Sequence, residues 1–174
     1  IKDMEISKKL SGDVDEMEKM LNEYLQFSKS TFSDKTETFD ISELINSTVK
    51  KYENAAISLD QPEKTIFNGR KNLIQRCLNN LIDNALKYAN KVKVKQEKFN
   101  NNIMIFIEDD GPGIQASEYE NVFKPFYKID KGRSDTKSSV GLGLSISSDI
   151  IRSHGGNIEL EKSELGGLKV KISL

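Results

Sequence analysis

The sequence of 174 residues predicts an α/β domain with one long helix in front of it. Three observations indicate this fold class. Residues 1 to about 33 repeat apolar side chains at helical spacing, and so does the stretch from Cys77 to Ala89. Lys91 to Phe99 then alternates polar and apolar residues before the wholly apolar run Ile103 to Ile107, which is typical of two adjacent strands. We place the boundaries at 1–34 for the extension and 38–174 for the domain.

Composition and charge exclude several classes of protein. The chain has 26 basic and 27 acidic residues, which leaves no excess positive charge for nucleic-acid binding. Its longest apolar run, Ile103 to Ile107, is far shorter than the ~18 residues of a membrane span. Cys77 is the single cysteine, so no internal disulfide is possible and a reducing compartment is favoured. We interpret Cys77 as a small core residue rather than a reactive thiol.

The first helix needs a partner. Its apolar residues follow a spacing close to the heptad of a coiled coil and find nothing to pack against within their own segment. That partner is another part of a longer chain, a second copy of this chain, or the main body of the domain. The sequence begins without Met inside the helical pattern, so we expect a piece of a longer protein. The residues of this seam are Leu10, Val14, Met17, Leu21 and Tyr24.

The next elements are short. Ser30 to Thr38 is a polar linker that ends in a short strand, and Asp40 with Glu43 forms a capping box before a helix over 41–55. Strands are predicted at Ile57–Leu59 and Thr65–Phe67, with a turn at Asp60–Pro62.

The helix around Cys77 to Ala89 carries an unusual polar stripe. A broad apolar face predicts packing on a core, and Asn80, Asn84, Lys87 and Tyr88 border that face. Amides at the edge of a core need hydrogen-bond partners. Either a neighbouring strand or a bound ligand therefore has to supply them.

The last third of the sequence holds a long loop and three further elements. Residues 111–140 lack periodicity, which is typical of a functional lid or a disordered segment. Leu142 to Ser153 predicts a helix that Gly155 and Gly156 end. Two strands close the chain, at Asn157–Glu161 and Leu168–Ser173.

Two glycine-containing motifs could bind a ligand. Asp109 to Ile114, read Asp-Asp-Gly-Pro-Gly-Ile, follows the apolar strand, where a carboxylate could accept from an amino group and glycines let a flat ring approach. Gly141 and Gly143 precede a helix whose first N–H groups could bind phosphate. Taken alone, the first motif is more typical of an ordinary acidic turn, and the second is equally compatible with ordinary loop chemistry. Neither Rossmann nor P-loop spacing is present.

His154 is the only histidine, and it lies at a predicted helix end. We favour a capping role for it over a catalytic one. With one histidine and one cysteine, no metal site built from these two residue types is possible.

The order of the motifs is more specific than any one of them. The asparagine helix, Asp109-Asp-Gly-Pro-Gly113, Phe123-Lys-Pro-Phe126, Gly141-Leu-Gly-Leu144 and His154-Gly-Gly resemble the catalytic ATP-binding domain of sensor histidine kinases. This resemblance covers about 38–174. Residues 1–34 resemble the second helix of that family's dimerisation and phosphotransfer hairpin.

The resemblance implies a Bergerat-type fold, in which a mixed, mostly antiparallel sheet is backed by three helices in a two-layer sandwich. ATP would lie under a flexible lid. Asp109 would receive the adenine amino group, and Tyr88 would pack near the base. Phe123 and Phe126 would anchor the lid. The other implied contacts with the nucleotide are Gly111, Gly113 and Ile114 near the base and Lys128, Gly141, Leu142, Gly143 and Leu144 toward the phosphates.

The resemblance also implies the chemistry. Asn84, assisted by Asn80, would hold Mg²⁺, and Lys87 would meet phosphate; these three are the candidate catalytic residues. The γ-phosphoryl of ATP would pass to a histidine on a hairpin helix outside this sequence, for relay to a response regulator. We therefore expect the chain to bind ATP without phosphorylating itself. The full-length protein would be a homodimeric phosphoprotein anchored in the inner membrane, with this part in the cytoplasm.

Two alternatives remain open. One is an ATP-hydrolysing conformational switch of the same superfamily, and the other is a non-catalytic interaction module. In the hydrolysing relatives, the position of Asn80 resembles a glutamate that can activate water. An amide cannot act as a general base, so Asn80 favours phosphotransfer.

Overall fold

The computed structural model describes residues 34–60, 63–100, 102–129 and 141–174, and scattered positions between 10 and 25. Part of the predicted turn at Asp60–Pro62 and the loop from Asp130 to Ser139 lie outside these residues.

A five-stranded sheet forms one layer of the domain. Its strand order is β2-β4-β5-β7-β6, and all neighbours are antiparallel except the parallel pair β2 and β4. β5 is therefore central, as predicted for the apolar run. The strands are β2 (Ile57–Leu59), β4 (Val92–Phe99), β5 (Asn102–Asp109), β6 (Asn157–Lys162) and β7 (Leu168–Ser173).

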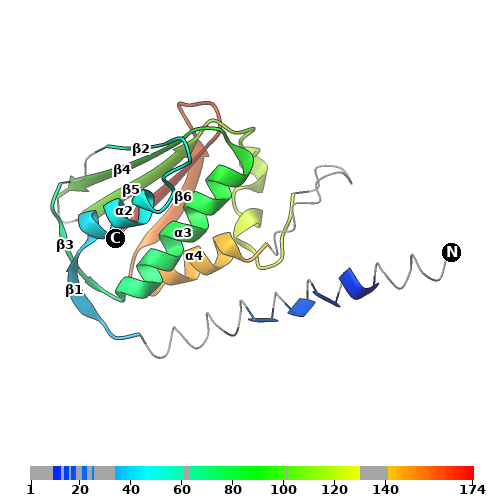
Figure 1. Ribbon diagram of the computed structural model, residues 1–174, viewed down its shortest axis with the longest axis horizontal. Coiled ribbons are helices and arrows are strands. Elements are labelled where there is room, and N and C mark those ends of the chain that lie inside the picture. The colour runs from blue at the N-terminus through cyan, green and yellow to red at the C-terminus, as the bar shows by residue number, and fades with distance from the viewer. Residues whose placement is uncertain are drawn as a thin grey trace.

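Three helices form the second layer on one face of this sheet (Figure 1). They are α2 (Ile41–Lys50), α3 (Lys71–Tyr88) and α4 (Gly143–Arg152). The predicted two-layer α/β sandwich is confirmed. A small antiparallel sheet of β1 (Glu37–Asp40) and β3 (Ile66–Gly69), which the sequence did not predict as a pair, lies beside it. Two short 3₁₀ turns, η1 (Ala116–Glu118) and η2 (Asn121–Phe123), interrupt the expected loop.

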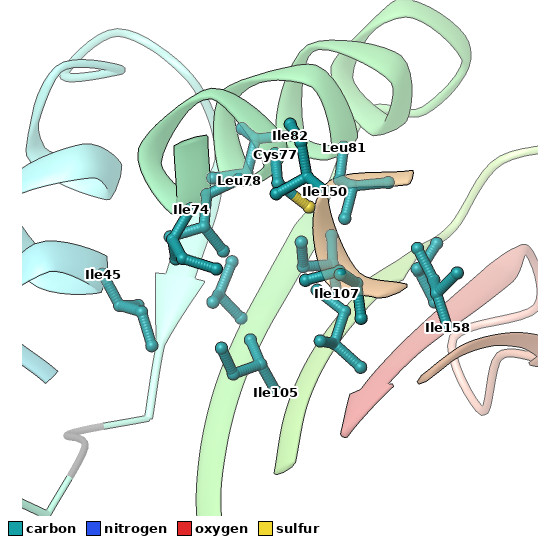
Figure 2. Close-up of a cluster of buried hydrophobic side chains, with 14 of the residues drawn as sticks. Ile45, Ile74, Cys77, Leu78, Leu81, Ile82, Ile105, Ile107, Ile150 and Ile158 are labelled. Carbon is teal, nitrogen blue, oxygen red and sulfur yellow. The ribbon is translucent and has the colours of Figure 1, made fainter. Parts of the chain in front are cut away.

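The core lies between the two layers. Figure 2 shows Ile105 and Ile107 of β5 close to the α3 and α4 side chains, among them Leu81 and Ile150. All four are about 1% exposed. Burial of such a side chain contributes roughly 1.5–3 kcal/mol. Cys77 lies in the same cluster, and burial raises the pKa of its thiol to about 12, which confirms a packing role.

Helix α2 begins where the sequence predicted and ends earlier. The Asp40 carboxylate accepts from the backbone N–H of Ser42 at 3.0 Å and of Glu43 at 3.4 Å, so Asp40 is the N-cap. The predicted end at residue 55 is wrong. Lys51 donates its N–H to Thr48 and Tyr52 donates to Val49, and these i to i−3 bonds tighten and end the last turn.

Helices α3 and α4 run side by side in opposite directions. Cys77 Sγ lies 3.9 Å from the carbonyl oxygen of Ser147, and Arg70 at the start of α3 bonds to the carbonyl of Ser153 at the end of α4. The carboxyl-terminal half of α3 therefore lies beside the first turn of α4. This pairing brings the asparagine stripe and the Gly-Leu-Gly motif together.

The described residues of the first helix leave its seam uncovered. The seam residues Leu10, Val14, Met17 and Leu21 are between 58% and 66% exposed, and Tyr24 lies outside the described residues. Packing of this seam on the main body of the domain is therefore not observed. Within the described residues no helix combines the length and the apolar character that crossing a membrane requires.

Candidate functional site

The polar stripe of α3 lies where the helix leaves the core. Asn80 and Asn84 are partly buried, between the buried residues Leu81 and Ala85 and the solvent. A Cβ added to Gly143 would lie 4.0 Å from the Cβ of Asn80, so this stripe borders the start of α4. The expected position at the edge of the core is confirmed.

The end of α3 carries the other two residues of the stripe. Lys87 is partly buried, and its Nζ lies 5.2 Å from the centre of the Tyr88 ring, which is 48% exposed. An ammonium group over an aromatic ring is held by the charge distribution of the ring. A Cβ on Gly111 would lie 2.9 Å from the carbonyl oxygen of Tyr88, so this end of α3 borders the turn that follows β5.

Asp109 is the last residue of β5, and two backbone N–H groups hold one oxygen of its carboxylate. Oδ1 accepts from the backbone N–H of Gly111 at 2.9 Å and of Leu168 at 3.1 Å. Burial raises the pKa of Asp109, and these two N–H groups partly oppose that shift. Among the described residues no hydrogen bond reaches Oδ2. This oxygen can accept a hydrogen from an amino group of a ligand.

Asp110 has different partners. Its Oδ1 accepts from the backbone N–H of Asn90 and of Lys91, each at 2.8 Å. These bonds lower the pKa of Asp110 and tie the segment after α3 to the turn after β5. Of the two neighbouring aspartates, Asp109 is thus the candidate acceptor for a ligand, and Asp110 has a structural role.

Close backbone approach explains the glycines of the first motif. A Cβ on Gly111 would lie 2.9 Å from the carbonyl oxygen of Tyr88, and Gly113 has a φ of +66°, a conformation that favours glycine. Ile114 follows them and packs partly against the core. The turn therefore presents backbone rather than bulky side chains beside Asp109.

The second motif starts α4. Gly141 has a φ of +75°, and its carbonyl accepts from the N–H of Phe126 at 3.0 Å. No side chain of the described residues caps the first turn of α4, so the N–H groups after Leu142 can face an anion. Leu142 is buried and Leu144 partly buried, so their side chains serve packing and only their backbone can serve a ligand.

Phe123, Phe126 and Lys128 flank the loop that is expected to form the lid, and they differ in burial. Phe123 packs partly against the core, whereas Phe126 is 56% exposed; because the loop from Asp130 to Ser139 lies outside the described residues, their role as anchors of the lid stays a prediction. Phe126 has a φ of +64° at the base of the loop, where its N–H donates to the carbonyl of Gly141. Lys128 is exposed two residues further on.

The polar groups of the site are of the kinds that bind a nucleotide and a magnesium ion. No group of three or more His, Cys, Asp or Glu residues that could hold a metal occurs in the described part of the chain. Mg²⁺ takes oxygen ligands, keeps several waters and commonly binds through substrate phosphates. The amide oxygens of Asn84 and Asn80 beside a candidate phosphate cradle fit such an ion.

His154 does what the sequence predicted, and more. Its Nδ1 lies 2.7 Å from the carbonyl oxygen of Ile150 near the end of α4, which confirms the capping role. Its Nε2 accepts from the backbone N–H of Arg70 at 3.0 Å, a contact with α3 that sequence reasoning missed. Burial lowers the pKa of His154.

Residues 69–174 match the family described as "Histidine kinase-, DNA gyrase B-, and HSP90-like ATPase". The chain is 28% identical to sensor histidine kinase GtrS of Pseudomonas aeruginosa over 176 residues, which cover all of this chain and 36% of GtrS. It is 34% identical to sensor protein kinase WalK of Staphylococcus aureus over 175 residues, 93% of this chain and 42% of WalK. The chain thus spans less than half the length of these relatives.

A solved structure supports the same assignment. The ATP binding domain of PrrB from Mycobacterium tuberculosis superposes with a TM-score of 0.67 at 26% identity, covering 81% of this chain and 97% of that domain. The predicted resemblance to the catalytic ATP-binding domain of sensor histidine kinases is confirmed.

Proposed function

Because the chain belongs to the histidine kinase-, DNA gyrase B- and HSP90-like ATPase family, we propose that it is the catalytic part of a sensor histidine kinase. In this role it binds ATP with Mg²⁺ and transfers the γ-phosphoryl to a histidine on a helix outside this sequence. The phosphoryl group then passes to a response regulator.

One observation carries the proposal. The described part of the domain combines an unpaired acceptor oxygen at Asp109 with an α4 whose first turn has no side-chain cap, and the asparagine stripe of α3 borders that turn. Oδ2 of Asp109 is available to the adenine amino group, and the first turn of α4 is available to phosphate. Asn80 borders that first turn. The arrangement suits a ligand with a base at one end and a triphosphate at the other.

Different residues of the site would bind the base and the metal ion. Asp109 orients the base, while Tyr88, Gly111, Gly113 and Ile114 border it. When bound, Mg²⁺ would supply positive charge at the phosphate end of the site. Asn84 and Asn80 would hold the ion.

Positive groups complete the phosphate end. The N–H groups of Gly143 and Leu144 at the start of α4, with Lys87 and Lys128, would hold the phosphate oxygens. Gly141 lets the backbone turn into α4. Asn80, an amide, supplies no base for activating water, which disfavours steady hydrolysis.

The uncovered seam of the first helix suits a second copy of the chain. We propose that it packs in a homodimer of the full-length protein, which is a phosphoprotein anchored in the inner membrane with this part in the cytoplasm. The exposure of Leu10, Val14 and Met17 supports a helix partner.

Transfer is tested by mixing the chain with a separate histidine-bearing hairpin and labelled ATP. The expected result is acid-labile label on the hairpin, which is lost with a hairpin whose histidine is replaced by glutamine and with the Asn84→Ala chain. An unlabelled hairpin would contradict the proposal. Steady phosphate release without the hairpin would favour a hydrolytic switch, and failure to bind an ATP analogue would favour a non-catalytic module.

A further inference from the structure

The turn between β6 and β7 packs against the Asp109 turn, although more than 50 residues separate them in the sequence. Ser163 donates its N–H to the carbonyl of Gly167, and Gly166 donates to the carbonyl of Ser163, which closes a tight turn. We propose that Gly167 is a positioning residue that sets the orientation of the base-binding carboxylate. This inference rests on the proposed function, since it assigns Asp109 to the base.

Two consecutive backbone N–H groups of this turn bind Asp109. Gly167 donates to the carbonyl oxygen of Asp109 at 3.0 Å, and Leu168 donates to Oδ1 at 3.1 Å. Gly111 donates to the same Oδ1 from the other side. The carboxylate is therefore held by N–H groups from two loops, and Oδ2 is the oxygen turned to a ligand.

Only glycine fits at position 167. A Cβ there would lie 2.1 Å from Oδ1 of Asp109, 2.5 Å from the backbone N of Gly111 and 2.6 Å from the carbonyl oxygen of Asp109. Two of these three atoms are backbone atoms and cannot rotate away. The Asp109 carboxylate would have to turn, or the β6–β7 turn would have to withdraw Leu168.

Either response removes a bond that orients the carboxylate. The adenine amino group donates to Oδ2 only while Oδ1 is held, so a side chain at 167 weakens recognition of the base and leaves the phosphate end intact. A hydrogen bond to a charged group corresponds to a change in affinity of roughly ten- to a hundredfold.

The neighbouring glycine provides a matched control. Gly166 has a φ of +107°, and a Cβ there would have no atom within 4 Å. Gly166→Ala therefore strains the same turn without touching Asp109. A loss of stability is expected in both variants, and a loss of base recognition in Gly167→Ala alone.

The test compares the affinity of the chain for a non-hydrolysable ATP analogue with its affinity for the inosine counterpart, whose base lacks the amino group. Wild type and Gly166→Ala should prefer the adenine analogue. Gly167→Ala should lose roughly ten- to a hundredfold in affinity for the adenine analogue and much less for the inosine analogue. An unchanged preference, or an equal loss for both analogues, would overturn the proposal.

Failure of the proposed function and failure of the positioning role give different results in this experiment. A wild-type chain that binds neither analogue refutes the proposed function, whereas a wild type that binds and a Gly167→Ala variant with wild-type preference refutes the positioning role alone. Should Gly167→Ala not fold, the backbone amide signals of Gly111 and Leu168 are followed by NMR in the wild type. They should shift more with the adenine analogue than with the inosine analogue, and equal shifts would overturn the proposal.

Discussion

Asp109 and Asp110 show how neighbouring residues of one type acquire different tasks. The first is buried, with one carboxylate oxygen held and the other open, and the second binds the segment that follows α3. Their pKa values shift in opposite directions for this reason: burial dominates at Asp109, and backbone N–H bonds dominate at Asp110.

Asp109→Asn should reduce affinity for an ATP analogue by roughly ten- to a hundredfold, because the amide can turn an N–H toward the adenine amino group in place of an acceptor. The measurement is calorimetric titration with adenine and inosine analogues. Asp110→Asn is the control and should keep the preference for adenine. The assignment fails if both variants lose the preference to the same extent.

Buried and exposed leucines should contribute differently to the stability of the domain. Leu78 on α3 is 1% exposed, so Leu78→Ala should lower the free energy of unfolding by about 2–5 kcal/mol through lost burial and a cavity. Leu165 is 44% exposed, and Leu165→Ala should change it by about 0.5 kcal/mol or less. Urea unfolding measures both. Equal losses would contradict the placement of the core.

Helices α3 and α4 are joined at the end remote from the candidate site. The neutral His154 ring donates from Nδ1 to Ile150 and accepts at Nε2 from the N–H of Arg70. Protonation of Nε2 would set two N–H groups against each other, and the Arg70 guanidinium adds positive charge nearby. The contact therefore requires the uncharged ring.

Stability should depend on pH through this ring. The pKa of His154 is lowered in the folded chain, so the unfolded chain binds more protons below about pH 6.5. The stabilisation is complete above the unfolded pKa and is lost as the pH falls through the folded pKa. His154→Ala should cost about 1 kcal/mol at pH 7.5, and the difference from wild type should shrink at pH 5.5. Urea unfolding at both values checks this; a difference that is constant or grows at low pH would refute it.

The elements differ in how far the sequence predicts them. The stretch from Cys77 to Ala89 and the run from Ile103 to Ile107 have regular apolar patterns; α3 ends one residue before Ala89, and β5 contains the whole run. The pairing of β1 with β3 and the early end of α2 depend on contacts between distant or short segments, which periodicity does not report. The packing of α3 on α4 likewise follows from the fold.

The candidate site shows the same limit. The types of residue at Asn84, Asp109 and Gly143 predict ligand chemistry because amide, carboxylate and helix N–H groups have definite partners. The role of Gly167 is visible only once the β6–β7 turn meets Asp109. In the sequence, Gly166 and Gly167 stand between the last two strands, and such a pair is equally typical of an ordinary turn.

Considered as a whole, the chain is a folded domain preceded by a helix with an uncovered seam. Val14→Glu combined with Leu21→Glu should reduce self-association, because both residues are about 60% exposed and charge on a seam opposes helix pairing. Sedimentation at several concentrations measures it. Asp15→Ala with Glu18→Ala is the control, since it alters the same helix and leaves the seam apolar. Wild-type association in the glutamate variant would contradict the dimer proposal.

In the proposed function, Asn84, the start of α4 and Asp109 together bind ATP with Mg²⁺. The decisive experiment titrates the chain with a non-hydrolysable ATP analogue, with and without Mg²⁺, beside Asn84→Ala. Wild type should bind more tightly with Mg²⁺, and Asn84→Ala should lose roughly tenfold or more of that gain through removal of a metal ligand. Equal affinities with and without the ion, or no binding by wild type, would contradict the account.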